Sequence, residues 1–198
     1  MHIADTLTTV RLIFAPIFLI LYLYMTQIEA IAVPLIMVLI VLLALVECTD
    51  FLDGFAARKL NQVSDFGKLF DPFADVILHI TAFFCFVIKG FMPSILFILI
   101  VYREFGMLFL RMISIKKDII IGARKGGKLK TFLYGCSVFF TLALDSALQS
   151  HAPLPEPLLR YGAIGLYILC TGAAYLSFWD YITHFTASFK RVKKVKKI

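Results

Sequence analysis

Six stretches of about 20 mostly apolar residues, separated by short polar or basic segments, constrain this sequence more than any other feature. A stretch of that length spans the hydrocarbon core of a bilayer as a helix. The backbone there must be helical, because no water is present to bond its N–H and C=O groups. The sequence therefore predicts an all-α, polytopic membrane protein with six transmembrane helices. The predicted spans are residues 7–25, 31–50, 69–88, 93–113, 131–148 and 160–181.

The composition supports this fold class and excludes others. Hydrophobic residues make up 61% of the 198 residues and charged residues 17%, whereas soluble domains have about 45–50% and about 25%. A disordered chain needs low hydrophobicity and high net charge, and a secreted disulfide scaffold of this length needs more than the four cysteines present. A soluble globule of this composition would expose large apolar patches to water, so a membrane protein is the remaining class.

Positive charge is distributed unevenly along the chain. Basic residues collect in Arg58-Lys59, in segment 116–130 and in the C-terminal tail, whereas the other three connections hold one basic residue, Lys89. Because cytoplasmic loops of membrane proteins are enriched in Lys and Arg, we expect an N-in/C-in protein of the cytoplasmic membrane. The same placement argues against a nucleic-acid partner, although the net charge is +7. We expect a membrane domain of residues 1–189 and a basic cytoplasmic tail of residues 190–198.

Four aspartates lie where two predicted spans end. Asp50 and Asp53 close the second span, Asp71 and Asp75 open the third, and each pair shares a helix face. A tight helical hairpin would bring the four carboxylates together at the cytoplasmic end, where they would repel one another. Oxygen ligands favour Mg²⁺ or Mn²⁺, and four carboxylates suit two such ions about 3.5–4 Å apart, an arrangement that supports phosphoryl chemistry. Carboxylates that merely cap two helices and face water are the weaker explanation, because charge in a membrane segment is costly.

The segment from Asp50 to Asp75 carries the pattern D-x2-D-G-x2-A-R-x8-G-x3-D-x3-D at every fixed position. It resembles the signature of the CDP-alcohol phosphotransferase family, whose members are six-span membrane enzymes and usually homodimers. They use a two-metal site to move a substituted phosphate from a CDP-linked donor onto an alcohol. The resemblance implies that Asp50, Asp53, Asp71 and Asp75 bind the metals and that Asp75 is the general base. It implies that the donor is bound by Asp50, Asp53, Gly54, Ala57, Arg58 and Gly67.

The acceptor alcohol has to be inferred from other residues. Arg103 lies deep in the fourth predicted span and Arg111 near its end. Buried arginines suit an anionic acceptor, because the guanidinium matches phosphate geometry. Nearly the whole chain resembles the family branch that makes phosphatidylglycerophosphate and CMP from CDP-diacylglycerol and sn-glycerol 3-phosphate. The resemblance rests on Leu7-Thr8-Thr9-Val10-Arg11, Arg103-Glu104-Phe105, Arg111 and Gly127-Lys128-Leu129-Lys130-Thr131. It implies that the acceptor's phosphate is held by Arg103, Arg111, Lys128, Lys130, Thr8 and Arg11.

Several alternatives stay open at this point. Another acceptor fits the same motif: inositol phosphate, serine, phosphatidylglycerol, or diacylglycerol with a CDP-choline donor. For Arg111, Lys128 and Lys130, enrichment of basic residues on the cytoplasmic side is an equally good explanation, and pairing with Glu104 would give Arg103 a structural role. A divalent-cation transporter is the alternative from another class, but transport should place charges near the bilayer midplane and in both halves of the molecule.

Two further polar residues have simpler explanations. His79, one turn beyond Asp75, is better explained as a buried packing histidine than as a residue that tunes the site. Asp145, near the end of the fifth span, is expected to cap a helix or pair locally.

Overall fold

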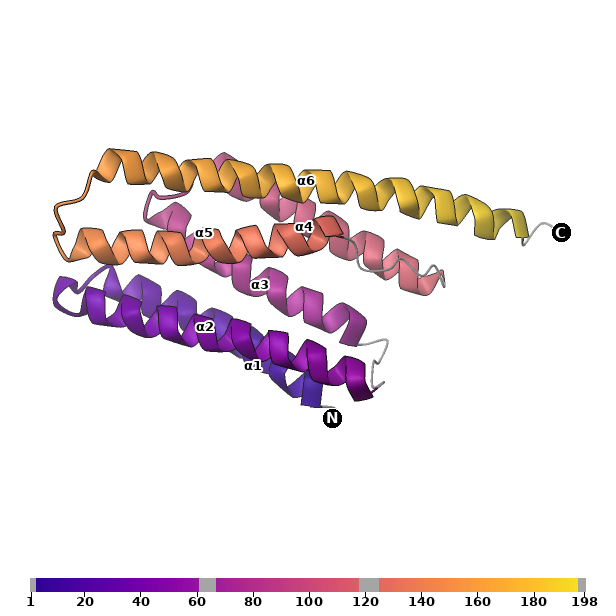
Figure 1. The fold of residues 1–198 in the computed structure, drawn as a ribbon, viewed down its shortest axis with the longest axis horizontal. Coiled ribbons are helices and arrows are strands. Elements are labelled where there is room, and N and C mark those ends of the chain that lie inside the picture. The colour runs from indigo at the N-terminus through magenta and orange to yellow at the C-terminus, as the bar shows by residue number, and fades with distance from the viewer. Residues whose placement is uncertain (1–2, 61–66, 118–124, 196–198) are drawn as a thin grey trace.

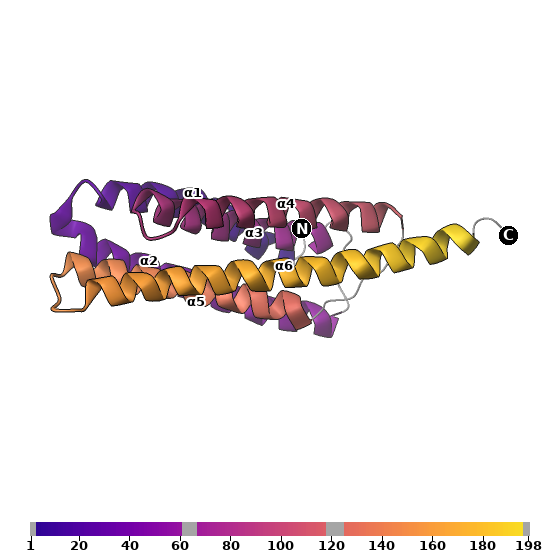
Figure 2. The same ribbon diagram turned by 90° about the horizontal axis from the view of Figure 1, so that it is seen from above.

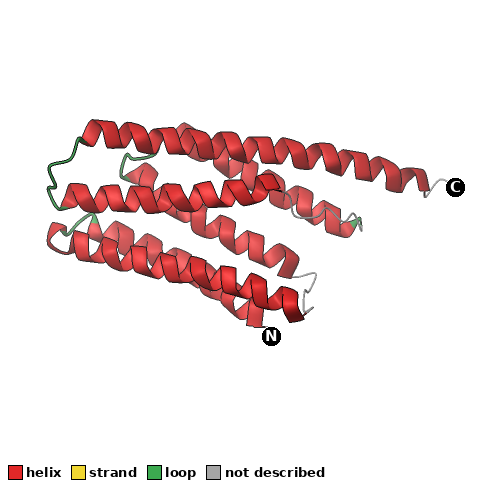
Figure 3. Cartoon of the chain, in the orientation of Figure 1, coloured by secondary structure: helices red, strands yellow, loops and turns green. Residues whose placement is uncertain are grey.

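The computed structural model is an elongated bundle of helices that lie side by side (Figure 1, Figure 2). It describes the backbone of residues 3–60, 67–117 and 125–195, and the side chains of residues 8–48, 69–117 and 126–189. Within these ranges the regular structure is entirely helical, without a strand (Figure 3). The helices are α1 (Ile3–Met25), α2 (Glu29–Leu60), α3 (Gly67–Ile88), α4 (Ser94–Lys116), α5 (Lys125–Gln149) and α6 (Glu156–Val195).

The apolar stretches predict where the helices lie, but not where they end. Each predicted span falls within one helix, except that residues 93–113 begin at Pro93, the N-cap of α4. Beyond the apolar stretches, α2 continues from residue 50 to Leu60 and α6 from residue 181 to Val195. Hydropathy ends a span where charge begins, whereas the helix continues because Arg and Lys are nearly as good helix formers as Leu.

The six described helices pack as a ring in the order α1, α2, α5, α6, α4, α3, and α3 also contacts α5 across the middle. Buried aromatic side chains fill the centre: Tyr22 of α1 packs edge-on against Phe86 of α3, and Phe83 of α3 packs in the same way against Tyr134 of α5. The α1–α2, α3–α4 and α5–α6 connections lie at one end of the bundle (Figure 1). At the opposite end α1 begins and α6 finishes, so this end carries the motif residues of α2 and α3.

The outer faces of the helices suit lipid. Large apolar side chains are exposed on each of the six, for example Ile20, Leu45, Phe84, Phe109, Phe132 and Leu176. Five helices (α1, α2, α3, α5 and α6) are long and apolar enough to cross a membrane. The remaining one, α4, is 23 residues long but carries Arg103, Glu104 and Arg111 in its apolar stretch. The all-helical fold is confirmed and is compatible with a polytopic membrane protein, while the sixth span and the N-in/C-in orientation stay predictions.

Candidate active site

Asp71 and Asp75 lie one turn apart on α3, and both accept hydrogen bonds from α1. The Thr8 hydroxyl donates to Asp71 Oδ1, and the Arg11 guanidinium donates to Asp75 Oδ1. Thr8 and Arg11 are buried, whereas 36% of the Asp75 side chain is exposed. The structure therefore places these two predicted acceptor-binding residues on the carboxylates that were predicted to bind metal, because α1 packs along α3.

The other half of the motif lies in the last turns of α2. Asp50 and Asp53 are in this helix, but their side chains lie outside the described residues. The described neighbour is Glu47, whose Oε1 is 3.7 Å from Nε2 of His79 on α3. Glu47 shares a helix face with Asp50, and His79 shares one with Asp75. The contact between Glu47 and His79 thus brings the last described side chains of α2 against α3, one turn from Asp75. The predicted donor-binding residues also lie in a part of the chain whose side-chain surroundings the structure does not describe: Gly54, Ala57, Arg58 and Gly67.

His79 is a buried residue of α3, one turn beyond Asp75 and farther from the motif end of the helix. Its Nδ1 lies 2.8 Å from the backbone oxygen of Asp75, and since a carbonyl only accepts, Nδ1 carries the proton. The ring packs against Tyr134 with 5.6 Å between ring centroids. His79 and Glu47 line a small cavity between α2, α3 and α5. The packing role predicted for His79 agrees with these contacts.

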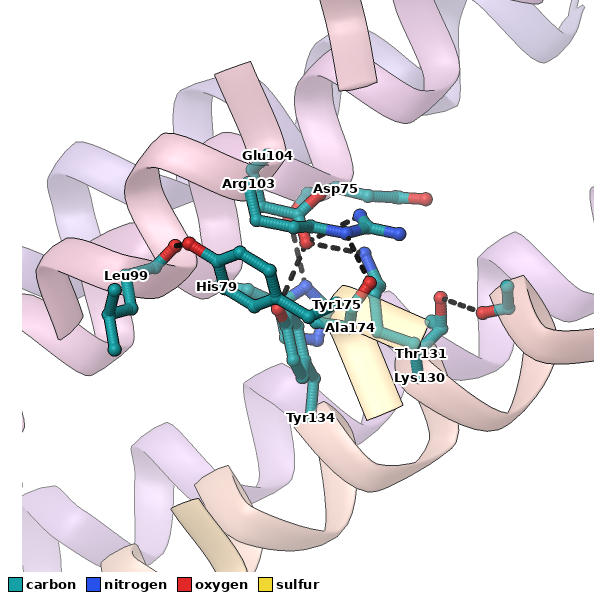
Figure 4. A network of polar contacts seen from close by, with 11 residues as sticks. Asp75, His79, Leu99, Arg103, Glu104, Lys130, Thr131, Tyr134, Ala174 and Tyr175 are labelled. Atoms are coloured by element: carbon teal, nitrogen blue, oxygen red, sulfur yellow. Dashed lines mark hydrogen bonds and ion pairs between the residues drawn. The ribbon is translucent and has the colours of Figure 1, made fainter. Parts of the chain in front are cut away.

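A cluster of two cations, one carboxylate and one tyrosine, which we call the cationic cluster, lies beside Asp75: Arg103, Lys130, Glu104 and Tyr134 (Figure 4). Glu104 Oε1 accepts hydrogen bonds from Arg103 Nη1, Lys130 Nζ and Tyr134 Oη, each at 2.9 Å. Arg103 Nε also donates to the backbone oxygen of Ala174 on α6, at 2.9 Å. The structural pairing of Arg103 with Glu104, one of the two explanations left open by the sequence, is present in the fold. It does not remove the positive charge, since Glu104 compensates only one of the two cations.

Arg111 and Lys128 complete the set of predicted acceptor-binding residues. Arg111 is half-buried, and among the described residues its guanidinium has no hydrogen bond or ion pair. Lys128 is exposed near the start of α5. Asp75 lies close enough to Arg111 and Lys130 to interact with both electrostatically. Asp75 of α3 therefore lies in the same region of the bundle as Arg103 of α4 and Lys130 of α5 (Figure 4).

The donor atoms present suit a hard divalent cation. Asp71 and Asp75 offer carboxylate oxygens, the ligands that Mg²⁺ and Mn²⁺ prefer. Among the side chains that the structure describes, no group of three or more His, Cys, Asp or Glu residues is placed to hold a metal ion. The side chains of Asp50 and Asp53 lie outside the described residues, so the four-carboxylate site stays a prediction.

Tyr134 and Asp145 show what the sequence does not reveal. Tyr134 was not singled out, although it lies one helical turn after Lys130 and therefore on the same face of α5. Asp145, expected to cap a helix or pair locally, has a local partner in Gln149 and also accepts a hydrogen bond from Tyr22 Oη of α1 at 2.7 Å. It also lies 3.9 Å from Nζ of Lys89, the first residue after α3. Its local contact with Gln149, at 3.5 Å, is longer than its bond to Tyr22. Such partners far apart in the sequence become visible only in the fold.

A bundle of helices with apolar outer faces that gathers carboxylates and a surplus of positive charge is the arrangement expected of a membrane-embedded enzyme that acts on phosphate esters. The chain belongs to the CDP-alcohol phosphatidyltransferase family, whose model matches residues 1–176. Three similar proteins carry the name CDP-diacylglycerol–glycerol-3-phosphate 3-phosphatidyltransferase. The protein from Treponema pallidum is 43% identical over 155 residues, covering 77% of this chain and 72% of its own. Those from Bacillus subtilis (29% over 143 residues, 72% and 70%) and Mycoplasma genitalium (31% over 147 residues, 73% and 61%) are more distant. The family predicted from the motif is confirmed.

Proposed function

We propose that the protein transfers the phosphatidyl group of CDP-diacylglycerol to sn-glycerol 3-phosphate, giving phosphatidylglycerophosphate and CMP. The observation that carries this proposal is the surplus of positive charge beside Asp75, formed by Arg103, Lys130 and Arg111 against one carboxylate, Glu104. A phosphorylated acceptor uses this charge, whereas a neutral alcohol does not. The names of the similar proteins agree with the same acceptor.

The reaction assigns a role to each part of the site. Two divalent ions, Mg²⁺ or Mn²⁺, bound by Asp50, Asp53, Asp71 and Asp75 would neutralise the diphosphate of the donor. Asp75 would take the proton from the acceptor hydroxyl; the partial exposure of its side chain and the pairing with Arg11, which stabilises its charged form, support this role. The hydroxyl oxygen then bonds to the phosphorus of the phosphatidyl group. The bond from this phosphorus to CMP breaks, and CMP leaves with the bonding electrons.

The proposed setting is the cytoplasmic membrane, with six spans and with the site and both termini on the cytoplasmic side. The outward face of α4 supports its assignment as a membrane span in addition to the other five helices. Its outward side chains Ile95, Phe105 and Phe109 are exposed and apolar. The charged residues Arg103 and Glu104 are buried inside the protein. Segment 116–130, which is rich in lysine and arginine, connects α4 to α5 on the side of the bundle where the motif lies, as the proposed orientation requires. We also propose a homodimer, because members of the family to which the chain belongs are usually homodimers.

The test is an acceptor panel with the purified protein in detergent–lipid micelles. Release of CMP from CDP-diacylglycerol is followed with Mg²⁺ or Mn²⁺ and one of sn-glycerol 3-phosphate, glycerol, inositol phosphate, serine or phosphatidylglycerol; a parallel reaction combines CDP-choline with diacylglycerol. We expect efficient turnover with sn-glycerol 3-phosphate and little with glycerol, which differs from it only by the phosphate. Turnover with a neutral acceptor, or with inositol phosphate in preference, would contradict the assignment.

A further inference from the structure

Glu104 is the buried carboxylate at the centre of the cationic cluster. One of its oxygens, Oε1, accepts hydrogen bonds from Arg103 Nη1 of its own helix and from Lys130 Nζ and Tyr134 Oη of α5 (Figure 4). Only 3% of the Glu104 side chain is exposed, and 2% of Arg103 and 13% of Lys130. The carboxylate therefore binds α4 to α5 at the level of the site.

This carboxylate keeps two buried cations close together. Arg103 Nη1 and Lys130 Nζ both lie 2.9 Å from the same oxygen, so they are at most twice that distance apart. Two uncompensated cations buried at this separation would repel each other and would each lack the solvation that water gives them. Glu104 offsets both effects, and the Tyr134 hydroxyl fixes the orientation of the carboxylate.

Both cations keep donors that Glu104 does not use. An ammonium group has three N–H donors, and Lys130 spends one of them on Glu104 while Nζ lies 4.6 Å from the centre of the Tyr134 ring. Arg103 uses Nε on the Ala174 carbonyl and Nη1 on Glu104, and no hydrogen bond of its Nη2 occurs within the described part of the chain. Their side chains are thus fixed without being saturated.

We propose that Glu104 is a positioning residue: it holds Lys130 and Arg103 so that their remaining N–H groups face the phosphate of the acceptor. With Arg111, the three cations and one carboxylate leave a net charge of +2, which matches a phosphate monoester that carries about −1.5 to −2 at pH 7. This inference rests on the proposed function, and it adds the residue that makes the site specific for a phosphate monoester. The gain from such pre-ordering is realised when the acceptor binds.

The test compares Glu104→Gln with the wild-type protein in full membrane-embedded form. The amide keeps the size and one acceptor oxygen but removes the charge that holds the two cations. We expect the KM for sn-glycerol 3-phosphate to rise at least tenfold, while kcat stays within threefold and the KM for CDP-diacylglycerol within twofold. The inhibition constant of inorganic phosphate, the minimal probe of the same pocket, should rise in parallel.

The matched control is Asp145→Asn. Asp145 is also a buried carboxylate, 3% exposed, that accepts a hydrogen bond from a tyrosine hydroxyl and lies near a lysine. It lies one turn before α5 ends, and α5 ends where the α5–α6 connection closes the bundle, away from the motif (Figure 1). It should lower thermal stability without changing either KM selectively. If Glu104→Gln does not fold, Tyr134→Phe removes one bond to Glu104 and keeps every charge, and we expect a rise of about threefold in the acceptor KM alone.

The outcomes separate this inference from the proposed function. Suppose that the wild-type protein turns over sn-glycerol 3-phosphate, but the folded Glu104→Gln variant has an unchanged or lower KM for it. This result overturns the role of Glu104 and leaves the proposed function standing. If Glu104→Gln does not fold, an unchanged KM in Tyr134→Phe has the same meaning. Wild-type turnover only with neutral acceptors overturns the proposed function and this inference together.

Discussion

Variants of two arginines in α4 should distinguish an effect on the stability of the bundle from an effect on acceptor binding. Arg103 is buried and donates to two acceptors, Glu104 Oε1 and the Ala174 carbonyl. Arg111, eight residues later, is half-buried and has no hydrogen bond or ion pair among the described residues. We therefore expect Arg103→Ala to affect stability and acceptor binding, and Arg111→Ala to affect acceptor binding alone.

The magnitudes follow from these contacts. Arg103→Ala leaves the Ala174 carbonyl without its side-chain donor and removes one of three donors from Glu104, which costs at least about 2 kcal/mol of unfolding free energy. For a chain of this length, that lowers the apparent Tm by about 4–8 °C. Arg111→Ala breaks no described bond, so its cost is within about 0.5 kcal/mol and its shift within about 2 °C. A charged hydrogen bond to the acceptor's phosphate contributes about 1.5–3 kcal/mol, so its loss should raise the acceptor KM about 10- to 100-fold in both variants.

The assay is CMP release at saturating CDP-diacylglycerol over a range of sn-glycerol 3-phosphate, with thermal denaturation of the same samples in detergent. Lys116→Ala is the control, because Lys116 is an exposed cation at the end of the same helix. It should change neither the Tm nor the acceptor KM. The reasoning is refuted if Arg111→Ala leaves the acceptor KM unchanged, or if it lowers the Tm as much as Arg103→Ala does.

Three further results are expected. Asp75→Asn should abolish CMP release while Mn²⁺ binding, followed by electron paramagnetic resonance, weakens less than in Asp71→Asn; an active Asp75→Asn protein would rule out Asp75 as the base. Chelation by EDTA should stop CMP release, and Mg²⁺ or Mn²⁺ should restore it, whereas full activity in EDTA would exclude the two-metal reaction. Tyr22→Phe should remove the hydroxyl donor of buried Asp145 and cost about 1–3 kcal/mol of stability with both KM values unchanged, and an unchanged Tm would show that this bond is not needed for stability.

The sequence predicts the helices of this protein well because apolar length is a local property. The stretches at 7–25 and 69–88 reappear as α1 and α3, since a bilayer span has to be helical and about 20 residues long. The apolar stretches alone do not predict the helix ends in polar surroundings, at Leu60 in α2 and Val195 in α6. Helix propensity continues there after hydropathy has stopped, so the apolar pattern carries no signal for them.

The site is predicted in its residue types but not in its pairings. The motif spacing identifies Asp71 and Asp75, and the depth of Arg103 in an apolar stretch marks it as buried. That Arg11 contacts Asp75 depends on α1 packing along α3, which no local pattern encodes. Lys130 likewise meets Glu104 only because α5 packs within reach of α4 across the bundle. Long-range partners of this kind are set by tertiary packing.

The central claim is that the carboxylates of α3 and the cations of α4 and α5 together join a CDP-linked lipid to a phosphorylated alcohol. Its most direct test is mass spectrometry of the lipid formed by the purified protein in liposomes from CDP-diacylglycerol and Mg²⁺, with equal concentrations of isotope-labelled sn-glycerol 3-phosphate, glycerol and inositol phosphate. The account predicts labelled phosphatidylglycerophosphate as the main product, formed in equal amount to CMP. A labelled phosphatidylglycerol or phosphatidylinositol phosphate in its place, or no lipid product at all, would contradict it.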